Sequence, residues 1–190
     1  MTPADLHLPV EERIFRAVNV DAGPWVDAIA RALSSPTFGA SVAVLLAAGL
    51  LLRRKGERFT WVLALAAALA LTDGLGSQVV RPLLPRARPV FALPEGTVRF
   101  IAPAANVGSM PSLHAANFFA MAAVGSAGFP AIGPALYLLA VAVAWSRLYV
   151  GVHWPGDVLL GAAWGTLWAW ASIAVLRRVV AARLRARGGQ

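Results

Sequence analysis

The side chains best suited to chemistry in this sequence are two histidines. His114 and His153 carry ring nitrogens that can donate a proton, accept one or attack an electrophile. Asp157 follows His153 by four residues, and the intervening Pro155 favours the start of a helix. A carboxylate there can accept a hydrogen bond from Nδ1 of His153, which leaves Nε2 as the attacking atom. The spacing therefore predicts a His–Asp nucleophile pair.

Three arginines and a serine lie in the polar segments around these histidines. Guanidinium groups are permanently charged and present forked donors that match phosphate oxygens, and a serine that opens a helix adds a hydroxyl and backbone N–H groups. These residues are Arg81, Arg88, Ser112 and Arg147. Together they predict a cage for a phosphoryl group, to which the stretch 108–109 can add further N–H groups.

Each of these residues also has a structural interpretation. Arginines beside membrane spans often snorkel or bind lipid headgroups. A single histidine at a helix start can be structural, His153 and Asp157 can form a plain interface hydrogen bond, and Ser112 can simply cap a helix. Chemistry is favoured because all of them fall at one predicted membrane face.

The composition predicts a membrane protein. Of 190 residues, 58% are hydrophobic and only 14% are charged, against about 25% charged in soluble proteins. The net charge is +8, but the basic residues form short clusters between apolar runs, which argues against a nucleic-acid partner. The absence of cysteine excludes disulfides, thiolate metal sites and cysteine nucleophiles.

Five apolar runs are long enough to cross a bilayer, which takes about 17 to 25 helical residues. They cover residues 32–52, 59–80, 112–128, 131–147 and 158–176. Asp73 interrupts the second run, and a structural role beside an arginine or a helix end is favoured for it over direct catalysis. The segment 81–110 holds five prolines, which argue against a continuous helix there.

These runs predict an all-α fold, a polytopic bundle of five to six transmembrane helices in a single domain, 1–190. Residues 1–34 are expected to form interfacial or short helices, one of them near 24–33, with a soluble N-terminal cap as the alternative. Residues 35–178 form the transmembrane core, and residues 179–190 form a basic cytoplasmic tail.

Isolated aromatic residues and one further histidine are expected to have structural roles only. Trp61, Trp145 and Trp154 are expected at the membrane interface, because they sit at the ends of predicted spans. Trp164 and Trp168 are expected to pack along the last helix. For His7, solvent exposure is expected.

Alternating spans place the 53–58 loop, the turn at 128–130 and the tail on one side of the membrane. That side carries nine Lys or Arg residues and one Glu, so the positive-inside rule assigns it to the cytoplasm. The 81–110 and 147–157 segments then face outward. We therefore expect the site to face outward and the C-terminus to be cytoplasmic, an arrangement that in a bacterial inner membrane places the site in the periplasm.

At these residues the sequence resembles the type 2 phosphatidic acid phosphatase (PAP2) superfamily. That family has three ordered motifs: Lys-x6-Arg-Pro, Pro-Ser-Gly-His and Ser-Arg-x5-His-x3-Asp. The third motif is complete here, from Ser146 to Asp157. The second has Leu113 in place of Gly, which removes a flexible position and narrows the site. The first has Arg81 in place of Lys, which keeps the positive charge.

The resemblance implies a metal-independent lipid phosphatase without a cofactor. His153 would attack phosphorus and form a phosphohistidine, His114 would protonate the leaving group and then assist water, and Asp157 would orient His153. The phosphate oxygens would be held by Arg81, Arg88, Ser112 and Arg147. The expected partners are membrane lipids and a lipid phosphate substrate: a polyprenyl diphosphate such as undecaprenyl diphosphate, phosphatidic acid, phosphatidylglycerol phosphate or the phosphate of lipid A.

Two alternatives share these motifs. Vanadate-dependent haloperoxidases have the same signature but are soluble, and five apolar spans argue against them here. A membrane protein that binds or translocates lipid phosphates without turnover would keep the cage, although the intact His153–Asp157 pair and His114 argue against it.

Overall fold

The structure, a computed structural model, describes residues 7–54, 57–101 and 108–188. Small parts of the predicted N-terminal segment, the 53–58 loop, the proline-rich segment and the tail (1–6, 55–56, 102–107 and 189–190) lie outside the described residues. Within the described ranges the chain is helical apart from connecting loops and one antiparallel bridge between Ala87 and Gly108. The predicted all-α fold is confirmed.

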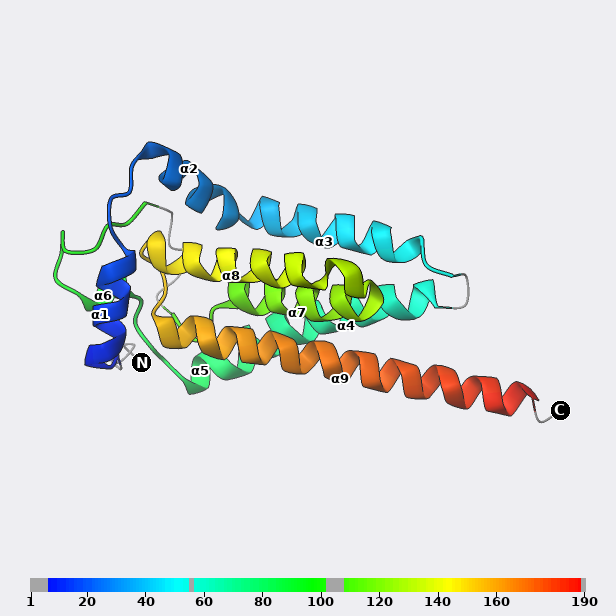
Figure 1. Cartoon of the computed structure of the whole chain (residues 1–190). Helices are drawn as coiled ribbons and strands as arrows, with labels where there is room; N and C mark the ends of the chain where they lie inside the picture. Colours follow the sequence, from blue (N-terminus) through cyan, green and yellow to red (C-terminus); the bar gives the residue numbers. More distant parts are fainter. Residues whose placement is uncertain (1–6, 55–56, 102–107, 189–190) are drawn as a thin grey trace.

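Five long helices lie side by side and form the bundle (Figure 1). They are α3 (Pro36–Leu51), α4 (Arg58–Leu75), α7 (Leu113–Gly128), α8 (Gly133–Tyr149) and α9 (Pro155–Gly188). Helix α7 contacts each of the other four and is the most deeply buried of them. Its sequence, LHAANFFAMAAVGSAG, is rich in alanine, and small side chains let neighbouring helices approach closely within a membrane.

Helices α7 and α9 meet at two glycines four residues apart on α9. A Cβ atom on Gly161 would lie 2.5 Å from the backbone oxygen of Ser112, and one on Gly165 would collide with the backbone of Ala116. The two backbones can touch only because these side chains are missing. The contact holds the start of α9, which carries Asp157, against the start of α7.

The first predicted span, 32–52, is not a single helix. The helix expected near 24–33 is present as α2 (Pro24–Leu33), and α3 follows it at an angle of 56°. The break arises because Pro36 begins a new helix and Ser35 caps it, its Oγ accepting a hydrogen bond from the backbone N–H of Phe38.

Two other spans differ from their predicted limits. Helix α4 continues into a π-helix (Gly76–Val80) and the short α5 (Arg81–Leu83), after which the proline-rich segment holds only the four-residue α6 (Pro89–Ala92) among its described residues. Helix α9 runs from Pro155 to Gly188, so most of the predicted tail is helical. Its last turns consist mainly of alanine, arginine and leucine, which are strong helix formers.

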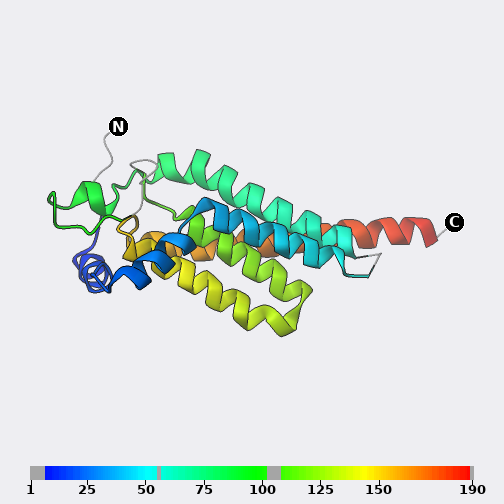
Figure 2. The same ribbon diagram turned by 90° about the horizontal axis from the view of Figure 1, so that it is seen from above.

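Helix α1 (Pro9–Val18) lies across one end of the bundle, as Figures 1 and 2 show. Its 10 residues make it about 15 Å long, too short to cross a bilayer. Phe15 is buried against the bundle, whereas Val10 and Ile14 are exposed. Helix α1 therefore caps this end of the molecule.

Three helical segments among the described residues are long and apolar enough to cross a membrane: Arg58–Leu83, Pro130–Tyr149 and Pro155–Ala182. The bent pair α2–α3 would make a fourth, and α7 has 16 residues. The number of five to six spans, and the single domain 1–190 with its internal limits, stay predictions. As predicted, the α3–α4 connection, the α7–α8 turn and the C-terminus lie at one end of the bundle, opposite α1, α5 and α6 (Figure 1).

Candidate active site

A cavity of about 750 Å³ lies between α2, α3, α4 and α7. Five of the seven predicted site residues line it: Arg81, Arg88, His114, Arg147 and His153. The rest of its wall is largely apolar and includes Ala43, Leu69 and Met121. A strongly basic pocket thus continues into an apolar one. Within the described ranges, no group of three or more His, Asp or Glu side chains could hold a metal ion.

A tight turn after α8 positions His153. Gly151 adopts a φ of +86°, where a side chain would be strained, and a Cβ atom there would lie 2.8 Å from the backbone oxygen of Arg99. The turn sends the chain back toward the bundle. His153 is only 1% exposed as a result.

The two ring nitrogens of His153 face different partners. Nδ1 lies 3.4 Å from Oδ2 of Asp157, a long hydrogen bond. Nε2 lies 3.2 Å from Nη1 of Arg88. With the proton on Nδ1, the lone pair of Nε2 accepts a hydrogen bond from Arg88, which also donates to the backbone oxygen of Val152 at 2.9 Å. Asp157 thus lies beside Nδ1, as does the Ser109 hydroxyl at 3.4 Å, and the orientation of His153 by Asp157 stays a prediction.

Burial keeps His153 neutral. It lowers the pKa of His153 to about 3; the hydrogen bond with Asp157 opposes this shift, and the charge of Arg88 adds to it. Burial and the nearby charge of Arg81 lower the pKa of Arg88 to about 10. At neutral pH the site therefore combines an uncharged imidazole with a charged guanidinium group.

Arg147 is fixed by the break between α2 and α3. It lies in the last turn of α8, is 7% exposed, and donates from Nη1 to the backbone oxygen of Ser34 at 3.0 Å. The hydroxyl of Ser34 lies 2.9 Å from that of Ser146. Ser34 was not predicted as a site residue, although the sequence Ser34-Ser35-Pro36 is typical of a helix break.

Asp73 is an exposed residue of α4 on the cavity wall. Its Oδ1 accepts a hydrogen bond from Nδ2 of Asn117 on α7 at 3.0 Å. The charge of Asp73 also acts on Arg81, so the amide of Asn117 is a partner in addition to the expected arginine. Leu113 also lines the cavity and packs against Gly76 in the π-helix, with Cδ2 2.6 Å from where a Cβ atom would lie.

Neither of the two serines before α7 is among the residues that line the cavity. Ser112 is fully buried and does not line the cavity; its N–H donates to the backbone oxygen of Asp157 at 3.0 Å, and its Oγ has no hydrogen-bond partner among the described residues. The N–H of Ser109 donates to the backbone oxygen of Arg86 at 2.8 Å, so it cannot serve a phosphate. The Ser109 hydroxyl instead donates to Oδ2 of Asp157.

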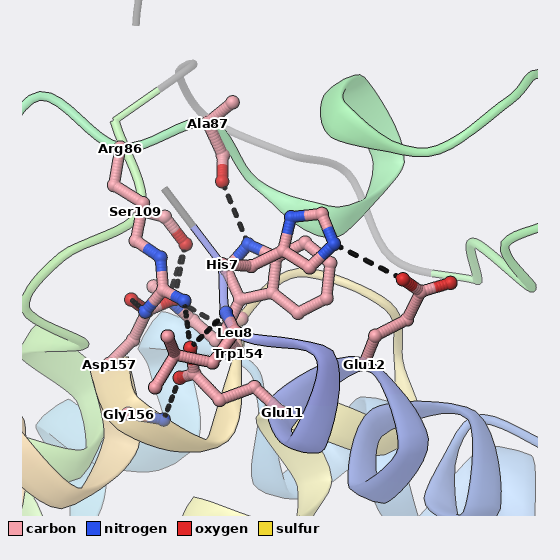
Figure 3. A network of polar contacts seen from close by, with 11 residues as sticks. His7, Leu8, Glu11, Glu12, Arg86, Ala87, Ser109, Trp154, Gly156 and Asp157 are labelled. Atoms are coloured by element: carbon pink, nitrogen blue, oxygen red, sulfur yellow. Dashed lines mark hydrogen bonds and ion pairs between the residues drawn. The ribbon is translucent and has the colours of Figure 1, made fainter. Parts of the chain in front are cut away.

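A charged network behind Asp157, drawn in Figure 3, was not predicted. Arg86 donates from Nη1 to Oδ1 of Asp157 at 2.9 Å and from Nη2 to Oε2 of Glu11 at 2.5 Å. Glu11 belongs to α1, and its Oε1 accepts from the backbone N–H of Gly156 at 2.9 Å. The sequence feature that could have revealed this network is the position of Arg86 inside the first motif, between Arg81 and Arg88.

His7 is not solvated, and the prediction was wrong. Its ring stacks on Trp154 with centroids 4.3 Å apart, and Nε2 lies 3.1 Å from Oε2 of Glu12 (Figure 3). Trp154 is fully buried, so it is not an interface residue, and neither is the buried Trp61. Packing was the right interpretation for Trp164 and Trp168, whose rings meet edge to face at 5.5 Å.

Comparison with known proteins gives two kinds of sequence match. The profile of the PAP2 superfamily matches residues 61–181. The lipid A 4'-phosphatase of Bacteroides thetaiotaomicron is 31% identical over 117 residues, 58% of this chain and 51% of that protein. The chain thus spans about half the length of this curated relative. The putative undecaprenyl-diphosphatase YbjG of Escherichia coli is 62% identical over 29 residues, 15% of each chain.

Two solved structures share the fold. The crystal structure of Aquifex aeolicus LpxE matches with a TM-score of 0.71 and 26% identity, over 90% of this chain and 99% of that one. The transmembrane PAP2-type phosphatidylglycerolphosphate phosphatase of Bacillus subtilis matches with a TM-score of 0.65 and 23% identity, over 90% and 86%. These likenesses extend to nearly the whole bundle.

Proposed function

Because this chain belongs to the PAP2 superfamily and is an integral membrane protein, we propose that it is a lipid phosphatase that acts through a phosphohistidine. One observation carries the proposal. A neutral, buried His153 lines a cavity that is also lined by a second histidine and four arginines, three of which are predicted site residues. The apolar remainder of the cavity suits a phosphate that is attached to a hydrocarbon chain.

The reaction has two steps. In the first, the lone pair of His153 Nε2 forms an N–P bond while the bond from phosphorus to the leaving oxygen breaks, and His114, which enters the step as an imidazolium ion, transfers its extra proton to that oxygen. In the second, His114 takes a proton from a water molecule, whose oxygen attacks phosphorus. The N–P bond then breaks, its electron pair returns to Nε2, and inorganic phosphate leaves.

The arginines act on the phosphoryl oxygens. Arg81, Arg88 and Arg147 neutralise the charge that spreads over these oxygens in the transition state. Arg88 is hydrogen-bonded to Nε2 in this structure, so the arriving phosphate must draw the guanidinium away before attack. The buried hydroxyl of Ser112, which lacks a partner among the described residues, is a further donor for a phosphate that enters deeply.

For the substrate, the relatives support two of the four candidates. One relative is a lipid A 4'-phosphatase and another a putative undecaprenyl-diphosphatase. Both substrates join a phosphate or diphosphate to a large apolar body, as the cavity requires. We propose a lipid phosphate of this class, and a panel that also contains phosphatidic acid and phosphatidylglycerol phosphate decides among them.

The decisive test is phosphate release by the protein purified in mild detergent with EDTA. We expect metal-free turnover of at least one lipid in the panel, and a loss of several orders of magnitude in His153→Ala, as for other catalytic nucleophiles. Arg54→Ala, at the opposite end of the bundle, is the matched control and should keep full activity. Activity that survives in His153→Ala would show that the nucleophile is another residue. A folded protein inactive on every lipid would favour binding without turnover.

For the orientation, we propose that the α1 end of the bundle faces the periplasm of a bacterial inner membrane. The chain contains no cysteine, so single cysteines can be introduced cleanly. Glu95 is exposed in the loop that follows α6, at the α1 end, and Arg54 is exposed in the α3–α4 connection, at the other end. The two variants are Glu95→Cys and Arg54→Cys. An impermeant maleimide added to intact cells should label only the first variant. Labelling of only the Arg54→Cys variant would show that the protein has the opposite orientation.

A further inference from the structure

The carboxylate of Asp157 is held on every side. Oδ2 accepts hydrogen bonds from the Ser109 hydroxyl, from the backbone N–H of Trp154 at 2.8 Å, and from His153 at 3.4 Å. Oδ1 accepts from Arg86 at 2.9 Å. The side chain of Asp157 is fully buried. A buried carboxylate with these donors stays ionised and has one orientation, which in turn fixes the ring of His153.

Arg86 connects this carboxylate to a second one. Its side chain is 4% exposed and forks between Asp157 and Glu11, with its charge also 5.6 Å from the ring centre of Trp154. It does not line the cavity, and its two Nη groups are already bonded to carboxylates, so we assign it no contact with the substrate. The guanidinium group is the donor best suited to bridging two carboxylates in a fixed geometry.

Glu11 in turn anchors α1 to the start of α9. Its Oε2 accepts from Arg86 and from the backbone N–H of Leu8 at 3.0 Å, and its Oε1 accepts from Gly156, which directly precedes Asp157. Burial raises the pKa of Glu11, but the hydrogen bonds from Arg86, Leu8 and Gly156 outweigh it, and the pKa lies below its ordinary value. Glu11 is therefore ionised at neutral pH.

Given the phosphohistidine function proposed above, we infer that Arg86 and Glu11 are positioning residues of the reaction, so that the docking of α1 controls the orientation of His153. Charges alternate from Glu11 to Arg86 to Asp157 (Figure 3). The series ends at the imidazole of His153, which lies beside Asp157. As His153 attacks phosphorus, its ring gains positive charge. Asp157 stabilises that charge, provided that Arg86 holds the carboxylate in place without neutralising it fully. Glu11 prevents full neutralisation of Asp157, because Arg86 divides its positive charge between the two carboxylates.

The inference is tested by kcat and KM of three variants of the full chain on the best lipid substrate. In Arg86→Gln, kcat should fall about 10- to 100-fold, the usual loss when the hydrogen-bond partner of a ligating or catalytic group is removed. In Glu11→Gln, kcat should fall up to about tenfold. KM should change less than twofold in both, because neither residue lines the cavity. Arg86→Lys should recover only part of kcat, since one ammonium group cannot fork between two carboxylates.

Glu12→Gln is the matched control. Glu12 lies one residue along α1 and pairs with Arg16 and His7 rather than with Arg86, so its kcat should equal that of wild type. Coupling gives a second readout: Glu11→Gln should lower kcat in the wild type but not in an Asp157→Asn background, because the effect of Glu11 passes through that carboxylate.

Three outcomes would overturn the inference while the phosphatase function stands. They are a kcat of Arg86→Gln within twofold of wild type, a Glu11→Gln effect that persists undiminished in Asp157→Asn, or equal losses in Glu11→Gln and Glu12→Gln. Variants that only melt at a lower temperature, with unchanged kcat for each folded molecule, would show a purely structural role. Failure of the function itself is recognised separately, by activity in His153→Ala.

Discussion

The two ends of the bundle are both rich in arginine but use it in opposite ways. At the far end from α1, Arg53 pairs with Glu57 one turn away, at 3.1 Å, with side chains 31% and 53% exposed. Arg177 lies over the ring of Trp61 at 4.9 Å. At the α1 end, Arg86, Arg88 and Arg147 are buried, at 3 to 7% exposure, and donate to carboxylates or backbone oxygens.

The difference is one of solvation. An exposed arginine keeps its water and contributes little through an ion pair, so the far end resembles any basic membrane flank. A buried arginine has lost that water, and its burial is costly unless partners replace it. Buried Nε atoms without a partner among the described residues occur at both ends, on Arg81 and Arg147 around the cavity and on Arg53 and Arg58 at the far end. The two ends differ in the guanidinium groups as a whole, which are largely desolvated only around the cavity, where a bound anion would replace the lost water.

The largest contrast is expected between matched arginine removals at the two ends. Arg147→Ala should lower kcat/KM about 10²- to 10³-fold, the usual loss when a transition-state charge donor is removed. Arg178→Ala should leave it within twofold, because this arginine is exposed at the other end. Phosphate-release kinetics of the purified variants measure both. Equal losses of kcat/KM in the two variants would mean that the burial of an arginine does not determine its importance for the reaction.

Packing should be separable from chemistry at the α7–α9 contact. Gly165→Val places a side chain against the backbone of Ala116 and should destabilise the protein by about 1 to 3 kcal/mol or more, seen as a lower melting temperature in detergent. Gly74→Ala is the control, since nothing lies within 4 Å of its Cβ position. A wild-type melting temperature for Gly165→Val would show that the two helices can separate without cost.

Acidification should weaken the α1 end through His153. Its pKa is lowered to about 3 from a model-peptide value of 6.5, so the unfolded chain binds a proton in this range that the folded protein does not. The stability due to the neutral ring is therefore complete above pH 6.5 and declines as the pH falls toward 3. Melting temperatures of wild type and His153→Gln should diverge between these values, with wild type losing more. Parallel curves would contradict this origin of acid sensitivity.

The smallest effect is expected at the far end. Glu57→Gln removes the surface ion pair with Arg53 and should leave the melting temperature almost unchanged, with kcat unchanged, because water screens exposed charges. Melting curves at low and high salt measure the effect, and any effect should vanish at high salt. A large drop in melting temperature that persists at high salt would mean that this pair, like those around Asp157, is structurally important.

The sequence predicted what local spacing encodes. Apolar run length located α3, α4, α7, α8 and α9, and the interval from His153 to Asp157 anticipated a contact within one helical turn. Local spacing did not predict contacts between distant segments, such as the ion pair of Arg86 with Glu11, which are 75 residues apart. Acidic and basic residues near predicted helix ends are usually solvated, so nothing local marks the few that are buried.

Figure 1 shows the first helix lying across the start of the last one, and Glu11 bonds to Gly156 across 145 residues of chain. That contact has a consequence for biogenesis. A chain inserted from its N-terminus presents α1 long before α9 has entered the membrane. Until α8 and α9 have followed, α1 lacks its docking surface and Asp157 has not arrived. Under the proposed function, a nascent chain would therefore bring Arg81 and Arg88 to the membrane before it could cleave lipid, and the docking of α1 would be complete only after the last helix is inserted.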